Sequence, residues 1–267
     1  MNINNLQSIE KVKFSKAKIA VVITAHNSLK TIVKTLQSIY NQKNCSDYIV
    51  LISDDFSNEK IKTVLNTKIQ DTRFIYFEVN FHSVYKNRNY LLHIVYQYGY
   101  NIELIIRCDS DDMFYDDFVL SRIEKSFFTS STIRKKCDFL LGGNTLYQNA
   151  KDTNKINLAT NLLKNNNYLL DRLYCMSQGY VEFELPSCNF VFKKGYDLFY
   201  PSIKSAEDHF LLVYSLMCYK KHSFRIDEDL MIMHYSLSGS LTKNNKKTDY
   251  LIRRKELYDF TYERIFL

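Results

Sequence analysis

The stretch KIAVVITAHN (18–27) predicts a buried strand, because β-branched and other apolar residues follow one another almost to its end. In the next stretch, SLKTIVKTLQSIYNQ (28–42), apolar residues recur every three or four positions, as on one face of a helix. A short apolar strand that leads directly into an amphipathic helix is the repeating unit of α/β proteins. These residues therefore predict the start of a parallel sheet.

The alternation continues through the first half of the chain. Three further strands are expected at 48–55, 73–80 and 102–109, with helices at about 56–68 and 86–98. After about residue 120 the pattern is less regular: strands are expected at 137–148 and 187–195, a polar Asn-rich and Lys-rich stretch at 149–167, and a helix from near Ser205. Together these elements predict a mainly parallel sheet with helices on both faces.

Composition limits the class of protein. A chain of 267 residues with 46% hydrophobic content can bury a sizeable core, and 6 Gly and 2 Pro leave no linker, so one compact domain is expected. The six cysteines form no CxxC pair, no apolar leader precedes them, and no stretch reaches the roughly 18 uncharged residues of a membrane span. We therefore expect buried thiols and a cytoplasmic location.

The net charge of +7 permits an anionic partner such as a nucleotide or lipid headgroups. Zinc-finger spacing, an arginine-rich helix and RNP aromatic motifs are all missing from the sequence, which argues against nucleic acid. Whether the chain forms an oligomer does not follow from these numbers.

Polar side chains follow three of the predicted strands, at the point where each strand ends. These are Thr24, His26 and Asn27 after the first, Asp54 and Asp55 after the second, and Asp109, Ser110 and Asp111 after the fourth. The carboxyl ends of parallel strands share one edge of a sheet, and ligands of α/β proteins bind at that edge. We therefore expect these three clusters to converge on one rim.

Asp109 and Asp111 are two residues apart, so both carboxylates point to one side if the strand persists to Asp111. A hard cation such as Mg²⁺ or Mn²⁺ often binds through one or two carboxylates plus a substrate phosphate. The alternative is an acidic helix start, with Asp111 or Asp112 as the cap of a helix over 116–127 and with Asp116 and Asp117 in its first turn.

Asp54 and Asp55 also allow two interpretations. In a helix start, Ser57 or Asp55 would be the N-cap, whereas an acid after the second strand of such a sheet commonly accepts a hydrogen bond from a ribose or base. The glycine fingerprint GxGxxG is missing after the first strand, which indicates a nucleotide geometry other than that of NAD-binding proteins.

Glu207 and Asp208 stand where a helix is expected to begin. Ser205 with Asp208 three residues later matches a capping box, and a general base aimed at an acceptor hydroxyl is a compatible second role for Asp208. His234 precedes a Ser/Gly-rich segment; an imidazole can complete a metal site, although a lone His is more often a packed or surface residue.

Taken in order, these motifs resemble the GT-A glycosyltransferases of family 2, over about residues 18–240. The matching segments are VVITAHNSLKTIVKTLQSI, VLISDDFSNE, NRNYLLH, IIRCDSDDMF and SAEDHFLL. The sequence departs from the family at three positions: Thr24 replaces the usual Pro, His26 the usual Tyr and Phe56 the usual Gly. The Gln-x-x-Arg-Trp type motif of processive members is missing, which favours single additions.

The resemblance implies a GT-A (Rossmann-like) α/β fold and a metal-dependent, inverting glycosyltransferase of hexosyl or N-acetylhexosaminyl type. The donor would be a nucleotide-diphosphate sugar, with UDP-sugar favoured, and the acceptor a hydroxyl of a glycan or lipid-linked molecule in surface polysaccharide biosynthesis (capsule, LPS or O-antigen). The GT-A domain would span 1–242, with a nucleotide-binding half at about 18–115 and an acceptor half at 116–242.

The resemblance also assigns roles to individual residues. Those assigned to nucleotide binding are Thr24, His26, Asn27, Asp54, Asp55, Arg88, Asp109 and Ser110, with Asp54 and Asp55 at the base. Those assigned to Mn²⁺ or Mg²⁺ are Asp111 and Asp109, to which His234 is added as a candidate. Asp208 would deprotonate the acceptor, and Glu207 would support it.

The segment 243–267 carries seven Lys and Arg against four acids, with an approximate apolar stripe. It is expected either to pack on the core or a second subunit, or to lie on the inner face of an anionic membrane as a peripheral contact. Two other functions stay open: a sugar nucleotidyltransferase, whose glycine-rich first loop is absent, and a non-catalytic nucleotide-sugar-binding protein.

Overall fold

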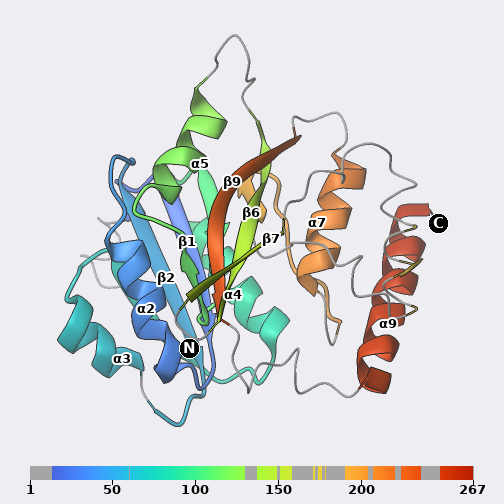
Figure 1. The fold of residues 1–267 in the computed structure, drawn as a ribbon, viewed down its shortest axis with the longest axis horizontal. Helices are drawn as coiled ribbons and strands as arrows, with labels where there is room; N and C mark the ends of the chain where they lie inside the picture. Colours follow the sequence, from blue (N-terminus) through green and yellow to red (C-terminus); the bar gives the residue numbers. More distant parts are fainter. Residues whose placement is uncertain are drawn as a thin grey trace.

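The strands form a single mixed sheet with helices on both faces, as a computed structural model of the chain shows (Figure 1). The structure describes residues 14–59, 61–129, 137–148, 151–157, 171, 174–175, 178, 190–203, 207–219, 224–235 and 247–266. Within these residues the sheet has nine strands, eight of them in the order β3-β2-β1-β4-β8-β6-β9-β5, with β7 paired to β6.

The first half of the chain supplies the parallel part of the sheet. Its strands are β1 (Ile19–Ala25), β2 (Tyr48–Asp55), β3 (Phe74–Val79) and β4 (Leu104–Arg107). The intervening helices are α2 (Leu29–Tyr40), α3 (Ile61–Val64) with the π-helical turn η2 (Leu65–Ile69), and α4 (Val84–Tyr98). The predicted α/β architecture is confirmed.

The second half adds the antiparallel and mixed part. Its strands are β5 (Asp112–Phe114), β6 (Phe139–Gln148), β7 (Lys151–Asn157), β8 (Phe190–Lys193) and β9 (Phe224–Tyr235). The sequence did not predict β5, β7 or β9. β5 is only three residues long and pairs with the distant strand β9, while β7 (KDTNKIN) pairs with the preceding strand β6 but lacks apolar alternation, so neither has a local pattern typical of a strand.

The acidic pair Asp116 and Asp117 was expected in the first turn of a helix, but the two residues lie before it. Helix α5 (Val119–Phe128) begins only after them. Asp116 accepts from the backbone N–H of Phe118 at 2.8 Å and pairs with Arg122 at 2.8 Å, while Asp117 pairs with Lys43 at 2.7 Å. The two carboxylates therefore serve local ion pairs on the α5 side of the sheet.

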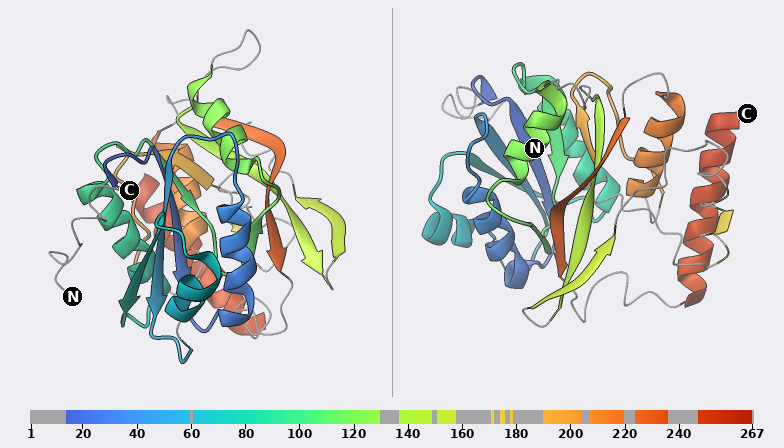
Figure 2. Two further views of the ribbon diagram at one scale, coloured as in Figure 1. Left: turned by 90° about the vertical axis from the view of Figure 1, so that its left-hand side faces the viewer. Right: turned by 45° about the horizontal axis from the view of Figure 1, so that its top comes forward.

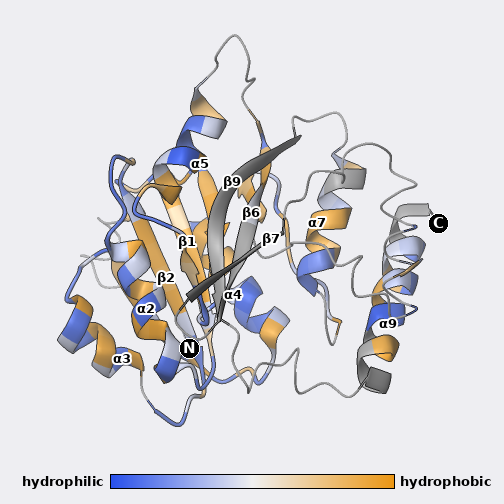
Figure 3. Ribbon diagram, in the orientation of Figure 1, coloured by the Kyte–Doolittle hydropathy of each residue, from blue (hydrophilic) through white to orange (hydrophobic). Residues whose placement is uncertain are grey.

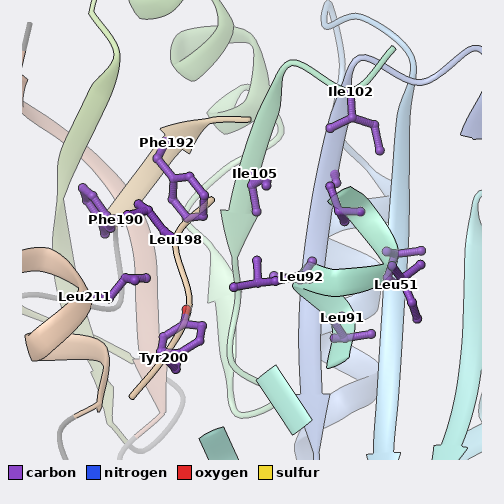
Figure 4. Packing of buried hydrophobic residues seen from close by; sticks show 14 of the residues in the cluster. Leu51, Leu91, Leu92, Ile102, Ile105, Phe190, Phe192, Leu198, Tyr200 and Leu211 are labelled. Carbon is purple, nitrogen blue, oxygen red and sulfur yellow. The ribbon is translucent and has the colours of Figure 1, made fainter. Parts of the chain in front are cut away.

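Two apolar layers enclose the parallel strands, which are hydrophobic along their length (Figure 3). On one side Leu91 and Leu92 of α4 belong to the same cluster as Leu51 of β2 and Ile105 of β4 (Figure 4). The other cluster contains the alternate residues of these strands together with the apolar face of α2 and α5. Burial on both faces is what a parallel sheet requires, and it leaves only the strand ends for polar chemistry.

The C-terminal segment is helical. Helix α9 (Lys247–Phe266) lies beside α7 (Glu207–Cys218), and the right-hand view of Figure 2 shows the two helices side by side. Leu257 is 1% exposed, whereas Ile252 on the same helix is 59% exposed. One face of α9 thus packs on the protein, as one of the two sequence interpretations expected. No helix among the described residues is long and apolar enough to cross a membrane.

Candidate active site at the carboxyl edge of the sheet

The ends of β1 and β2 are joined by hydrogen bonds just beyond the sheet. His26 Nδ1 donates to the carbonyl oxygen of Asp55 at 2.6 Å, and Asn27 Nδ2 lies 3.0 Å from His26 Nε2, so the ring proton belongs on Nδ1. The backbone N–H of Asn27 donates to Ser57 Oγ at 2.7 Å. The loops after these two strands therefore form one edge, with His26 and Asn27 exposed on it.

The carboxylates of Asp54 and Asp55 have partners inside the protein. Asp54, 1% exposed, accepts from the hydroxyls of Ser57 and Tyr76, and burial together with Asp54 raises the pKa of Tyr76. Asp55, 5% exposed, accepts the backbone N–H groups of residues 81, 82 and 83, at 2.6, 3.0 and 3.0 Å. Neither residue caps the helix that follows, which begins at Ile61. Their predicted contact with a base stays a prediction.

A network of buried charges lies at the end of β4. Arg107, from β4, contacts Asp109 Oδ2 at 2.9 Å and Asp208 Oδ2 at 3.2 Å. Arg88, from α4, contacts Asp109 Oδ1 at 3.3 Å and pairs with Glu207. Asp109 is therefore held between two arginines, and the same arginines bind both acids at the start of α7. The sheet and α7 meet through these ion pairs.

The sequence NRN (87–89) explains how α4 holds this network in place. Asn87 is buried and donates to the carbonyl oxygen of Ser53 at 3.3 Å, which fixes α4 to the end of β2. Asn89 makes two hydrogen bonds to the backbone of Tyr200, at 2.7 and 2.8 Å. The guanidinium of Arg88, between these anchors, lies 5.3 Å from the centre of the Tyr200 ring.

The two neighbouring acids of α7 have pKa values displaced in opposite directions. Burial raises the pKa of Glu207 in spite of its pairing with Arg88. Burial would also raise the pKa of Asp208, but His209, Arg107, Arg88 and a further arginine from α9 outweigh it and hold that pKa well below its ordinary value. Asp208 is therefore a carboxylate at every physiological pH.

The further arginine is Arg254, which links α9 to the network. Its Nη1 lies 2.6 Å from Nδ1 of His209, the residue after Asp208, and both side chains are buried. Because a guanidinium only donates, Nδ1 of His209 is the acceptor in this contact. Arg254 thereby adds a permanent positive charge close to Asp208, and it is one of the groups that lower the pKa of that carboxyl.

The predicted metal residues lie in a turn rather than on a strand. β4 ends at Arg107, and the backbone N–H of Asp112 donates to the carbonyl oxygen of Asp109 at 3.0 Å, so the strand does not persist to Asp111. Asp111 is partly exposed in this turn. Among the described residues no group of three or more His, Cys, Asp or Glu forms a metal cluster.

The structure describes some of the remaining predicted residues and not others. Thr24 is the next-to-last residue of β1 and is partly buried, and the carbonyl oxygen of Ser110 accepts from Thr35 Oγ1 at 3.1 Å. The backbone of His234, on β9, is paired opposite Asp112 of β5, which brings this strand to the turn. Ser205, the expected cap of α7, and residues 236–242 lie outside the described residues.

Sequence reasoning missed Arg107, Tyr200 and Arg254. Arg107 had a signal, because a charged residue that interrupts the apolar strand LIIRC needs a partner in the folded protein. Tyr200 and Arg254 had none, since each reaches the network from a segment far away in the sequence.

Comparisons with known proteins concern the sequence and the fold. Residues 20–131 match the sequence model described as "Glycosyl transferase family 2". The overall fold is similar to that of S. aureus TarS (residues 1–349) in complex with UDP-GlcNAc, with a TM-score of 0.63 and 17% identity over 94% of this chain and 68% of that chain. The fold is that of GT-A glycosyltransferases.

A second protein with a similar GT-A fold is the mannosyltransferase PcManGT from Pyrobaculum calidifontis, in complex with GDP-Man and Mn²⁺. Its TM-score is 0.51 at 10% identity, over 93% of this chain and 74% of that chain. The present chain spans 66% of TarS 1–349 without ligand and 40% of the longer TarS chain. No curated protein sequence matches the chain. At these identities the likeness concerns the GT-A fold alone.

Replacing Arg107 with Gln should raise the pKa of Asp208, because the nearest permanent positive charge is removed from a buried carboxylate. The titration is followed by ¹³C NMR of the side-chain carboxyl. Arg122→Gln, which removes an arginine paired with Asp116 instead, is the matched control and should leave the pKa of Asp208 unchanged. An Asp208 titration that is the same in Arg107→Gln and in the parent protein would show that the ion pair does not set this pKa.

Proposed function

We propose that this protein transfers a sugar from a nucleotide-diphosphate sugar, with a UDP-sugar as the favoured donor, to a hydroxyl of a glycan or lipid-linked acceptor. The observation that carries the proposal is the contact of Arg107 with both Asp109 and Asp208. Through this contact Asp109, at the end of a parallel strand where α/β proteins bind nucleotides, lies close to Asp208, the ionised acid at the start of α7. The match of residues 20–131 to the family model supports the same reaction class.

On the acceptor side, Asp208 has the properties of a general base for a hydroxyl. It is ionised at neutral pH, and its position is fixed by Arg107 and by the backbone N–H of His209, which donates to Asp208 Oδ1 at 2.9 Å. In the proposed step the acceptor oxygen forms a bond to the anomeric carbon and its proton passes to Asp208. The bond from that carbon to the diphosphate oxygen breaks on the opposite face, so a single displacement inverts the configuration.

On the donor side, the leaving diphosphate gains negative charge as its bond to the sugar breaks. Arg88 and Arg107 are permanent positive charges at the end of β4, and both are mostly buried, so their field is weakly screened. These two charges offset two of the three carboxylates around them, and Arg254, behind His209, adds a third positive charge. With three arginines to three carboxylates, a highly charged donor can enter beside Asp109 without an excess of negative charge.

The carboxylates in this part of the site suit a divalent cation, Mn²⁺ or Mg²⁺. Both ions take oxygen ligands and are often bound by one or two carboxylates plus substrate phosphates. Asp111, partly exposed in the turn after Asp109, is the residue that we assign to hold it, whereas Asp109 is already bound by two arginines. When bound, the cation would stabilise the charge of the leaving diphosphate.

The wider role that we propose is the stepwise building of a surface polysaccharide, one sugar at a time. In this proposal the nucleotide-binding half is about 18–115 and the acceptor half 116–242, so that β4 and α7 contribute the two sides of the site. The absence of the processive motif from the sequence supports single additions.

Nucleotide binding should depend on Mn²⁺. Calorimetry is expected to show that Mn²⁺ strengthens UDP binding and that Asp111→Ala loses most of this gain, since the variant lacks the carboxylate assigned to the cation. Asp117→Ala removes an acid that pairs with Lys43 outside the site and should keep the full effect of Mn²⁺. Equal binding of UDP by the parent protein with and without Mn²⁺ would remove the metal from the proposal.

Asp208→Asn should bind UDP as the parent protein does, yet lower the rate of sugar transfer by about 10²–10⁴-fold, because the amide cannot accept the hydroxyl proton. Asp116→Asn, in an acid bound to Arg122 instead, is the control and should transfer at the parent rate. A variant Asp208→Asn that transfers sugar at the parent rate would refute the assignment of the base.

A further inference from the structure

We propose that the exposed ring of Phe56, set edge-to-face against His82, is the surface on which the base of the donor nucleotide stacks. Phe56 follows the last residue of β2 and is 53% exposed, and the centres of the two rings lie 5.2 Å apart at an angle of 69°. An exposed aromatic ring at the edge where α/β proteins bind ligands offers a planar face to a base. The inference rests on the proposed function and names one part of its binding site.

The backbone at Phe56 is held in a conformation that a bulky residue seldom adopts. Its φ is +58°, in the left-handed region, where the Cβ atom of an L-residue is crowded. The backbone N–H of Phe56 is nevertheless fixed by the carbonyl oxygens of Asp54 at 3.1 Å and Val79 at 3.0 Å. Strain of this kind persists only where the surrounding structure imposes it, and it is typical of binding sites.

The neighbouring loops share this feature. Asn27, after β1, has φ +50°, and His82, after β3, has φ +48°. The loops after β1, β2 and β3 therefore each hold one left-handed residue other than glycine, and all three residues are exposed. The loops present an aromatic ring pair and the amide and imidazole of the β1 loop on a single edge.

The buried carboxylate of Asp55 fixes the loop that carries part of this surface. It accepts the backbone N–H groups of residues 81 to 83, so it fixes the loop that carries His82, and Phe56 follows Asp55 directly in the chain. The carboxylate of Asp54 instead accepts from the hydroxyls of Ser57 and Tyr76. Asp55 thus positions the ring pair, and the exposed rings are the groups in direct reach of a ligand.

The distance across the sheet suits a nucleotide. β2 and β4 are separated by β1 alone, so their ends are two strand spacings apart, about 10 Å. A ribose links a base to its diphosphate over a distance of this order, so a base on Phe56 leaves the diphosphate near Asp109 and its arginines. Stacking on an aromatic ring holds any base by its face, and hydrogen bonds from the loops then select among bases.

The chain contains no tryptophan, which allows a direct test by fluorescence. Phe56→Trp places a single tryptophan in the proposed site, and saturating quenching is expected with UDP and with UMP but not with pyrophosphate. The control is Tyr100→Trp, in a residue that is 82% exposed and follows α4 at the opposite edge of the sheet, and no nucleotide should quench it.

Calorimetry on Phe56→Gly gives an independent measurement. UDP affinity should fall about 5- to 150-fold, the effect of losing one stacked base, while pyrophosphate binding with Mn²⁺ should not change. Glycine accepts a positive φ, so the melting temperature should not fall below that of the parent protein. Gln70→Gly, at an exposed position with φ +44° away from this edge, is the control and should leave UDP binding unchanged.

The outcomes separate this inference from the proposed function. If the parent protein binds UDP and Phe56→Gly binds it equally well, the stacking surface is refuted while the glycosyltransferase assignment stands. If the parent protein binds neither UDP nor any other nucleoside diphosphate, the proposed function fails and the inference fails with it.

Discussion

A buried arginine at the end of a parallel strand is the constraint on which the site depends. Arg107 is nearly inaccessible to water, so its charge must be met by carboxylates within the protein, and Asp109 and Asp208 supply them. Three carboxylates gathered without these arginines would repel one another, and at least one would become protonated. The ion pairs therefore determine where α7 meets the sheet and keep Asp208 ionised at that point.

Helices α4 and α9 hold the residues of this network in place. The asparagines on both sides of Arg88 fix α4 to β2 and to the backbone of Tyr200, so the guanidinium keeps its place between Asp109 and Glu207. On the far side α9 brings Arg254 to His209, the neighbour of Asp208. The C-terminal helix is thereby part of the electrostatic environment of the proposed base, in addition to its packing on α7.

Local pattern was sufficient to predict the parallel half of the fold. The strand 48–55 was predicted with the bounds that β2 has, because an uninterrupted apolar run and the acids that end it lie within eight residues. The pattern could not show β5 and β9, whose pairing partners are distant in sequence, or β7, whose polar sequence lacks apolar alternation. Candidate residues were likewise found by residue type and by position at strand ends, but the sequence did not show which groups they contact. Asp55, for example, binds the backbone of the loop after β3. Arg107 was overlooked because its partners include a residue of another element, Asp208 of α7.

The central claim is that the carboxyl edge of the sheet and the start of α7 form one site for a nucleotide sugar. Its most direct test is to incubate the protein with UDP-, GDP- and dTDP-sugars in the presence of Mn²⁺ and to measure the nucleoside diphosphate that is released. The account predicts release from at least one donor, with UDP-sugars favoured. No release above the buffer rate from any nucleotide sugar, with Mn²⁺ or with Mg²⁺, would contradict it.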